Sequence, residues 1–241
     1  MDSIFIRSVK YVPPDNPDGY PFLLPVVKDI EKIRFTNPVT FLVGENGTGK
    51  STLIEAIAVA AGFNAEGGTK NYSFTSQDTT SPLHEHLTLI RGHVREKHGY
   101  FLRAESFYTT ANYAENGTVT IAGPSPLYFG GKRMHEQSHG EAFVSIVKDF
   151  KPRGLYIFDE PESALSPKRL FELMRCMHKL AAQGSQFIVA THSPILMAYP
   201  SVIYEMSEKG IRKKTYDELD NVHVMRDFLN HPDVFLKHIL D

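Results

Sequence analysis

The 241-residue sequence contains one cysteine, little net charge and no apolar run long enough to cross a membrane. A single cysteine, Cys176, excludes an internal disulfide and favours a reducing compartment. With 26 basic and 28 acidic residues, the formal net charge of −2 gives the whole chain no general attraction for nucleic acid. The first residues also lack the basic and apolar segments of a secretory signal. We therefore expect a soluble, cytoplasmic protein that does not insert into a membrane.

The strongest motif is a glycine-rich loop at 44–51 that fits the pattern G-x-x-x-x-G-K-[ST] of a phosphate-binding P-loop. An apolar, β-rich run at 39–43 precedes the loop, and apolar residues at helical spacing follow it through 52–61. This order places a helix N-terminus and a run of backbone N–H groups beneath a polyphosphate. Lys50 would bring its charge to the β- and γ-phosphates, and the Ser51 hydroxyl would bind Mg²⁺. The nucleotide-binding residues predicted from this loop are Gly44, Glu45, Asn46, Gly47, Thr48, Gly49, Lys50, Ser51 and Thr52.

Expected strands and helices alternate along the chain. We expect strands at 4–11, 39–43, 99–104, 154–158 and 186–190, a hairpin at 202–213, and helices at 52–61, 83–96, 141–150, 167–183, 217–229 and 232–240. Residues 26–33 fit either a short strand or a helix, residues 62–81 a long surface loop, and residues 107–135 irregular structure. The sequence has no internal repeat, coiled-coil heptad or low-complexity tract. The alternation predicts an α/β P-loop NTPase fold with a mainly parallel sheet covered by helices.

Polar residues follow two of the expected buried strands. Asp159 and Glu160 come directly after the apolar run at 155–158, at the strand end where open α/β sheets bind ligands. Asp159 is suited to the Mg²⁺ shell and Glu160 to polarising an attacking water, although a helix cap is the weaker alternative for such a pair. His192 follows the next strand and could reach the γ-phosphate to relay a proton or a hydrogen bond. A lone histidine is otherwise more often a surface or core residue.

Together these segments resemble the ATP-binding-cassette (ABC) ATPases, and within them the SMC/Rad50/RecF-like branch of predicted AAA/ABC ATPases. The resemblance rests on residues 44–51, 158–161, 163–166 and 191–193, which stand in the family's order along the chain. It implies one ABC-type ATPase domain over 1–241. A RecA-like core would occupy about 1–105 and 151–241, and a short subdomain carrying the signature loop would occupy about 106–150. Residues 163–166 resemble the D-loop that touches the opposite subunit.

The resemblance also implies further site residues, with departures from the family pattern. Ser138 and Gly140 match the signature loop, but His139 replaces its first glycine and Glu141 its glutamine. Glu105 resembles the Q-loop residue with glutamate in place of glutamine, and would join Ser51 and Asp159 as a metal ligand. Gln77 is a weaker rival for that position. Tyr11 could stack on adenine, with core packing at least as good an explanation.

The resemblance implies an enzyme that hydrolyses ATP with Mg²⁺ as cofactor and uses Glu160, His192 and Lys50 in catalysis. It implies that Asp159 and Glu160 of one subunit meet the partner's signature loop through Ser138, so that two ATP molecules hold a head-to-tail homodimer. Our first hypothesis is a stand-alone ATPase whose ATP-driven dimerisation acts with DNA or a soluble effector protein. The alternative is the ATP-binding subunit of a membrane ABC transporter. A nucleotide-binding regulatory module with negligible turnover is disfavoured by the intact catalytic set.

Overall fold

The structure is a computed structural model that describes residues 4–70, 80–105, 128–129, 132–133 and 139–240. Its centre is a six-stranded sheet with the strand order β10-β9-β2-β8-β7-β4. All neighbouring strands run parallel except β9 and β10, which form an antiparallel hairpin. The prediction of a mainly parallel sheet is therefore confirmed. The strands are β2 (Val39–Val43), β4 (His98–Arg103), β7 (Gly154–Asp159), β8 (Gln186–Thr191), β9 (Val202–Ser207) and β10 (Gly210–Lys214).

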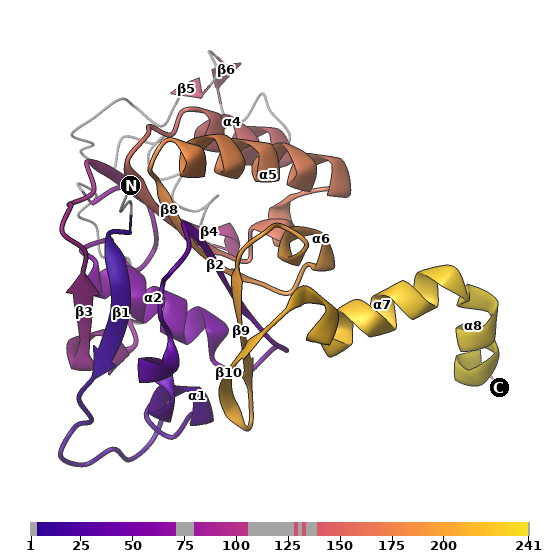
Figure 1. Ribbon diagram of the computed structural model, residues 1–241, viewed down its shortest axis with the longest axis horizontal. Helices are drawn as coiled ribbons and strands as arrows, with labels where there is room; N and C mark the ends of the chain where they lie inside the picture. Colours follow the sequence, from indigo (N-terminus) through magenta and orange to yellow (C-terminus); the bar gives the residue numbers. More distant parts are fainter. Residues whose placement is uncertain (1–3, 71–79, 106–127, 130–131, 134–138, 241) are drawn as a thin grey trace.

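Both faces of this sheet are covered, as Figure 1 shows. One face carries α2 (Lys50–Ala60), α1 (Pro25–Lys28) and the antiparallel pair of β1 (Ile6–Tyr11) with β3 (Leu87–Arg91). The other face carries α4 (His139–Lys148), α5 (Pro167–Ala182) and α6 (Pro194–Met197). Coverage on both sides explains why the central strands are continuous apolar runs rather than alternating ones.

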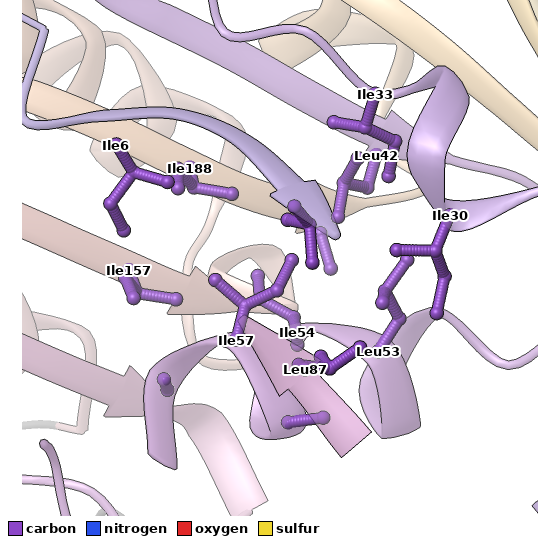
Figure 2. Packing of buried hydrophobic residues seen from close by; sticks show 14 of the residues in the cluster. Ile6, Ile30, Ile33, Leu42, Leu53, Ile54, Ile57, Leu87, Ile157 and Ile188 are labelled. Carbon is purple, nitrogen blue, oxygen red and sulfur yellow. The ribbon is translucent and has the colours of Figure 1, made fainter. Parts of the chain in front are cut away.

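Strand β7 shows how one strand serves two hydrophobic cores. Its side chains alternate between the faces, with Leu155 and Ile157 in the core beneath α2 and Tyr156 and Phe158 in the core beneath α4 and α5. Figure 2 shows part of the first core, where Ile157 lies among isoleucine and leucine side chains from α2, β1 and β8. Both cores hold the carboxyl ends of β2, β7 and β8 along one edge of the sheet.

The buried side chain of Gln186 links the small β1–β3 sheet to the main sheet. Its Oε1 accepts hydrogen bonds from the backbone N–H groups of Phe5 at 2.8 Å and Ile6 at 2.9 Å. Its Nε2 donates to the Ile6 carbonyl at 2.9 Å. The amide therefore supplies the hydrogen bonds that a neighbouring strand would otherwise give to the start of the chain.

The chain ends in two helices that extend away from the body (Figure 1). A short 3₁₀ turn, η5 (Tyr216–Glu218), leads into α7 (Asp220–Asn230) and α8 (Pro232–Leu240). Val222 is buried and fixes the base of α7, whereas α8 buries no residue in the described structure. None of the helices in the described ranges is both long and apolar enough to cross a membrane.

One expected segment is wrong, one open alternative is resolved, and two segments are only partly described. Residues 83–96 are not a helix, because a 3₁₀ turn, η2 (Pro82–His86), is followed by strand β3. Residues 26–33 are helical, as α1 and the 3₁₀ turn η1 (Ile30–Lys32). Of the expected loop at 62–81, residues 71–79 lie outside the described residues. Of the segment 107–135, the described parts form a short hairpin of β5 (Tyr128–Phe129) and β6 (Lys132–Arg133).

Candidate active site

The P-loop connects β2 to α2, and two of its glycines are required by the backbone. A Cβ on Gly44 would lie 2.2 Å from the carbonyl oxygen of Met206. Gly49 precedes α2 with φ of 93°, a left-handed conformation that side chains disfavour. Lys50 opens α2 with only 3% of its side chain exposed, and its Nζ donates to the Glu45 carbonyl at 2.8 Å. The loop thus closes over its own lysine at a helix N-terminus, where an anion binds readily.

Asp159 ends β7 beside the first turn of α2. The Ser51 hydroxyl donates to Asp159 Oδ1 at 3.1 Å. Burial raises the pKa of Asp159 to about 6, although the guanidinium of Arg103 and the bond from Ser51 oppose this rise. A bound cation would instead favour the charged carboxylate. One carboxylate and one hydroxyl in contact are oxygen donors of the type that Mg²⁺ binds together with substrate phosphates, so these residues fit that ion.

Glu160 follows with φ of 47° and ψ of 54°, a left-handed conformation that is uncommon outside glycine. Its backbone N–H donates to the Ala190 carbonyl at 3.0 Å, which fixes this conformation against β8. Its Oε1 lies 3.9 Å from Lys50 Nζ and 3.7 Å from His192 Nδ1. Burial lowers the pKa of Lys50, and the charge of Glu160 is the largest influence opposing that shift. Strain of this kind is concentrated at functional sites.

Comparison with known proteins agrees with this geometry. Residues 142–198 match the family model described as "AAA domain, putative AbiEii toxin, Type IV TA system", and residues 22–118 match one described as "AAA domain". The macrolide export ATP-binding/permease protein MacB of Campylobacter jejuni subsp. jejuni (serotype O:23/36) is 23% identical over 203 residues, which cover 73% of this chain and 30% of MacB. The DNA repair protein RAD50 of Drosophila melanogaster is 36% identical over 72 residues, 30% of this chain and 6% of RAD50.

A solved structure extends the likeness to almost the whole fold. It is cbiO1 from Clostridium perfringens, part of the ABC transporter complex cbiONQ, with a TM-score of 0.50 at 15% identity. The match covers 96% of this chain and 97% of cbiO1. This chain therefore has the fold of the ABC-type P-loop ATPases and contains two segments that match AAA domain models. It spans 30% or less of the length of the first three curated relatives.

The structure places further residues around the P-loop that the sequence did not indicate. The hydroxyl of Tyr20 is hydrogen-bonded to the side chain of Thr52, the last predicted nucleotide-binding residue, and 68% of Tyr20 is exposed. Tyr11 instead pairs with Leu87 in the β1–β3 sheet and packs against the hydrophobic core. The turn-rich stretch before Tyr20 gave no indication that the chain returns to the P-loop there.

Arg103 is a second residue that the sequence did not indicate. It lies at the end of β4, paired with Asp159 across the sheet, and its Nε is 3.6 Å from Asp159 Oδ2. Its NH1 group donates to Glu55 of α2 at 2.7 Å. The position of Arg103 at a strand end was visible in the sequence, but its role depends on β4 lying beside β7, which sequence patterns do not specify.

Glu105 is exposed and lies two residues after the end of β4, where the described chain is helical. Its charge is among the influences that raise the pKa of Asp159, which places it on the same side of the site. Within the described residues, Glu105 makes no hydrogen bond or ion pair with Ser51 or Asp159. No group of three or more histidine, cysteine, aspartate or glutamate side chains in the described structure could hold a metal by itself. The metal-ligand role of Glu105 stays a prediction, and its rival Gln77 lies outside the described residues.

The predicted signature loop is described only in part, because Ser138 lies outside the described residues. Helix α4 begins at His139, two residues earlier than expected. A Cβ on Gly140 would lie 3.1 Å from the Ala164 carbonyl, in the segment that follows Glu160. The beginning of α4 therefore packs closely against the expected D-loop.

His192 and Glu162 complete the site. His192 follows β8 with 48% of its side chain exposed, and its Nδ1 lies 3.4 Å from Glu162 Oε1. Glu162 belongs to the 3₁₀ turn η4 (Pro161–Ala164) directly after Glu160. The sequence analysis did not single out this glutamate, although it stands directly after the Asp-Glu-Pro segment at 159–161. The site thus contains three carboxylates, from Asp159, Glu160 and Glu162, around one lysine and one histidine.

Proposed function

We propose that this chain hydrolyses ATP with Mg²⁺ and that ATP binding joins two copies head to tail. The observation that carries the proposal is the meeting of Lys50, Ser51, Asp159, Glu160 and His192 at one sheet edge, with Oε1 of Glu160 within 4 Å of both Lys50 and His192. These residues come from α2 and from the carboxyl ends of β7 and β8. Such convergence supplies a phosphate site, a metal site and a base at one place on the sheet edge.

The side chains divide the reaction between them. Lys50 and the N–H groups of the P-loop would hold the β- and γ-phosphates, and Ser51 with Asp159 would hold Mg²⁺, which neutralises developing phosphate charge. Glu160 would accept the proton of the water whose oxygen attacks the γ-phosphorus while the bond to the β-phosphate oxygen breaks. His192 would donate a hydrogen bond to the γ-phosphate.

The dimer is the finer part of the proposal. Residues 106–150 would present Ser138 and Gly140 to the nucleotide of the second copy, while the core at 1–105 and 151–241 holds its own. In this arrangement ATP is bound between the copies, and hydrolysis separates them. We propose that this cycle acts with DNA or a soluble effector protein. The local likeness to RAD50, named as a DNA repair protein, supports that choice.

A second candidate is the ATP-binding subunit of a membrane transporter. The likeness to MacB covers 73% of this chain, and cbiO1, part of a transporter complex, matches along nearly its whole length. In that case a separate permease would be the partner, and the chemistry at the sheet edge would be the same.

The first experiment measures the mass of the Glu160→Gln variant by light scattering after gel filtration. Removing the base should trap bound ATP, so we expect a dimer with ATP and Mg²⁺ and a monomer without them. Glu172→Gln on α5 is the matched control, because this glutamate pairs with Lys148 and Arg169 away from the P-loop. A Glu160→Gln protein that stays monomeric at saturating ATP would overturn the dimer proposal.

A pull-down with the same trapped variant separates the two candidate functions. Recovery of DNA or a soluble protein only with ATP would support the first candidate. An integral membrane protein recovered under the same conditions would support the transporter subunit.

A further inference from the structure

We propose that Glu162 is a positioning residue that holds His192 for the reaction. This inference rests on the proposed ATP hydrolysis. Glu162 Oε1 accepts three hydrogen bonds: from Thr191 Oγ1 at 2.6 Å, from the His192 N–H at 2.6 Å and from the Ser193 N–H at 3.1 Å. One carboxylate oxygen therefore binds three consecutive residues at the end of β8.

These bonds join the two chain segments that carry the reacting side chains. Strand β8 ends at Thr191, so the N–H groups of the next two residues lie beyond the strand and need acceptors elsewhere. Glu162 lies two residues after Glu160, in the turn η4. A single side chain thus fixes the distance between the segment of the proposed base and the segment of the histidine.

The backbone of His192 is held on both sides. Its N–H donates to Glu162, and its carbonyl accepts from Nδ2 of Asn221, in the first turn of α7, at 3.4 Å. The imidazole Nδ1 lies 3.4 Å from Glu162 Oε1 and 3.7 Å from Glu160 Oε1. Carboxylates beside Nδ1 favour a hydrogen on that nitrogen, and Nε2 donates to the γ-phosphate in the form of the ring in which both nitrogens carry hydrogen.

If Glu162 served only to accept hydrogen bonds at the end of β8, its side chain would not need a charge. Only 9% of the Glu162 side chain is exposed, and its Oε2 is buried without a hydrogen-bond partner in the described structure. A neutral amide could accept the same three bonds without the cost of burying a charge. These observations connect the carboxylate to the site.

The test is a double-mutant cycle on steady-state ATP turnover by the full chain. Glu162→Gln keeps the shape and the acceptor but removes the charge. We expect kcat to fall by about 10-fold, within the 10- to 100-fold range typical of residues that orient a reacting group, with KM for ATP changed less than about twofold. Glu162→Ala should approach the kcat of His192→Ala. In the His192→Ala background, neither change at Glu162 should lower kcat further, because Glu162 acts through that histidine.

Glu96→Gln is the matched control. Glu96 is as buried as Glu162, with 7% of its side chain exposed, and it pairs with Lys70 and Arg91 away from the P-loop. This control should lower thermal stability and leave kcat unchanged.

Two results would overturn the inference. One is a Glu162→Gln enzyme with the wild-type kcat, a result that decides the question even where Glu162→Ala does not fold. The other is an additive loss in the double variants, which would show that Glu162 and His192 act independently. Failure of the proposed function is distinguishable, because the wild-type protein itself would then show no turnover that Lys50→Ala abolishes.

Discussion

Two side chains of strand β7 show how burial can keep one group neutral and oppose the charge of another. Tyr156 and Asp159 lie three residues apart on this strand, and burial raises the pKa of the first to about 12 and of the second to about 6. The Tyr156 hydroxyl donates to the Lys151 carbonyl at 2.6 Å and accepts from the Lys151 N–H at 2.9 Å. It is neutral and satisfied at any physiological pH. Asp159 instead has a pKa raised to about 6, so at neutral pH it is mostly ionised although burial opposes its charge.

The same contrast extends along the two edges of the sheet. At the amino end of β8, the buried side chain of Gln186 is neutral and hydrogen-bonded. At the carboxyl edge, Glu162 Oε2 is a charged oxygen that is buried without a hydrogen-bond partner in the described residues, whereas the hydroxyls of Thr40 and Ser201, which also lack partners there, are neutral. Satisfied neutral groups stabilise a fold, whereas unsatisfied charges lower stability and are retained where a ligand uses them. We therefore expect a change at Gln186 to act mainly on stability and changes to the charges at the carboxyl edge to act mainly on function.

The largest expected effect is at the carboxyl edge. Lys50→Ala removes the charge that would bind the phosphates, so we expect ATP turnover to fall by about a thousandfold, as with the loss of other preorganised electrostatic groups. The melting temperature should change little or rise, because a buried ammonium is removed. Phosphate release and differential scanning fluorimetry measure the two effects. Residual turnover within tenfold of wild type would contradict the assignment of Lys50.

The opposite pattern is expected at the amino edge. Gln186→Leu leaves two N–H groups and one carbonyl of the chain start without partners, and each buried unsatisfied group costs about 1–3 kcal/mol. We expect a loss of about 3–5 kcal/mol in unfolding free energy, and a melting temperature lower by about 10 °C or more. Turnover per folded molecule should remain unchanged. Urea unfolding followed by circular dichroism tests this, and a stable but inactive variant would reverse the roles of the two edges.

The residues that could be predicted from sequence are those set by local pattern. The apolar runs that form β2, β7 and β8 give way to Gly44, Asp159 and His192 at the carboxyl ends of these strands. This pattern is enough to place all three residues at the carboxyl edge. The contacts of Arg103 and Glu162 depend on which strands are neighbours and on their register. That information is held in tertiary packing and not in any one segment.

The error at 83–96 has a physical cause of the same kind. Leu83, Leu87, Ile90 and Val94 stand at helical spacing, and this pattern predicts one amphipathic helix. In the structure Leu83 and Leu87 are buried, but Ile90 and Val94 are exposed. Pairing of residues 87–91 with β1 overrides the helical spacing, because β1 offers a row of backbone partners.

Asp159→Asn should raise the unfolding free energy of the nucleotide-free protein and abolish its stabilisation by ATP with Mg²⁺. The folded pKa of about 6 lies above the unfolded value of about 3.9, so the folded state binds the proton more tightly and wild-type stability falls as pH rises from about 4 to about 6. At pH 8 without nucleotide, we expect the variant to be more stable by about 1–3 kcal/mol, because the charge is absent. Near pH 4 the two proteins should converge.

ATP with Mg²⁺ should then raise the melting temperature of the wild type and not that of Asp159→Asn. Asp149→Asn, an exposed aspartate, is the control and should behave like the wild type at every pH. A variant less stable than the wild type at pH 8 would show that Asp159 stabilises the fold instead of the ligand.

The smallest effect is expected for Tyr156→Phe, three residues before Asp159 in β7. The change removes two hydrogen bonds to Lys151, whose backbone can turn to water, so we expect a loss of about 1 kcal/mol at pH 7. The folded pKa of about 12 exceeds the unfolded value of about 10, so the wild type should lose stability as pH rises above about 10 while the variant does not. The two unfolding free energies should therefore approach each other at alkaline pH, as urea titrations at pH 7 and 10.5 would show. A difference that grows with pH would mean that the ionised phenol is the form that the Lys151 backbone binds.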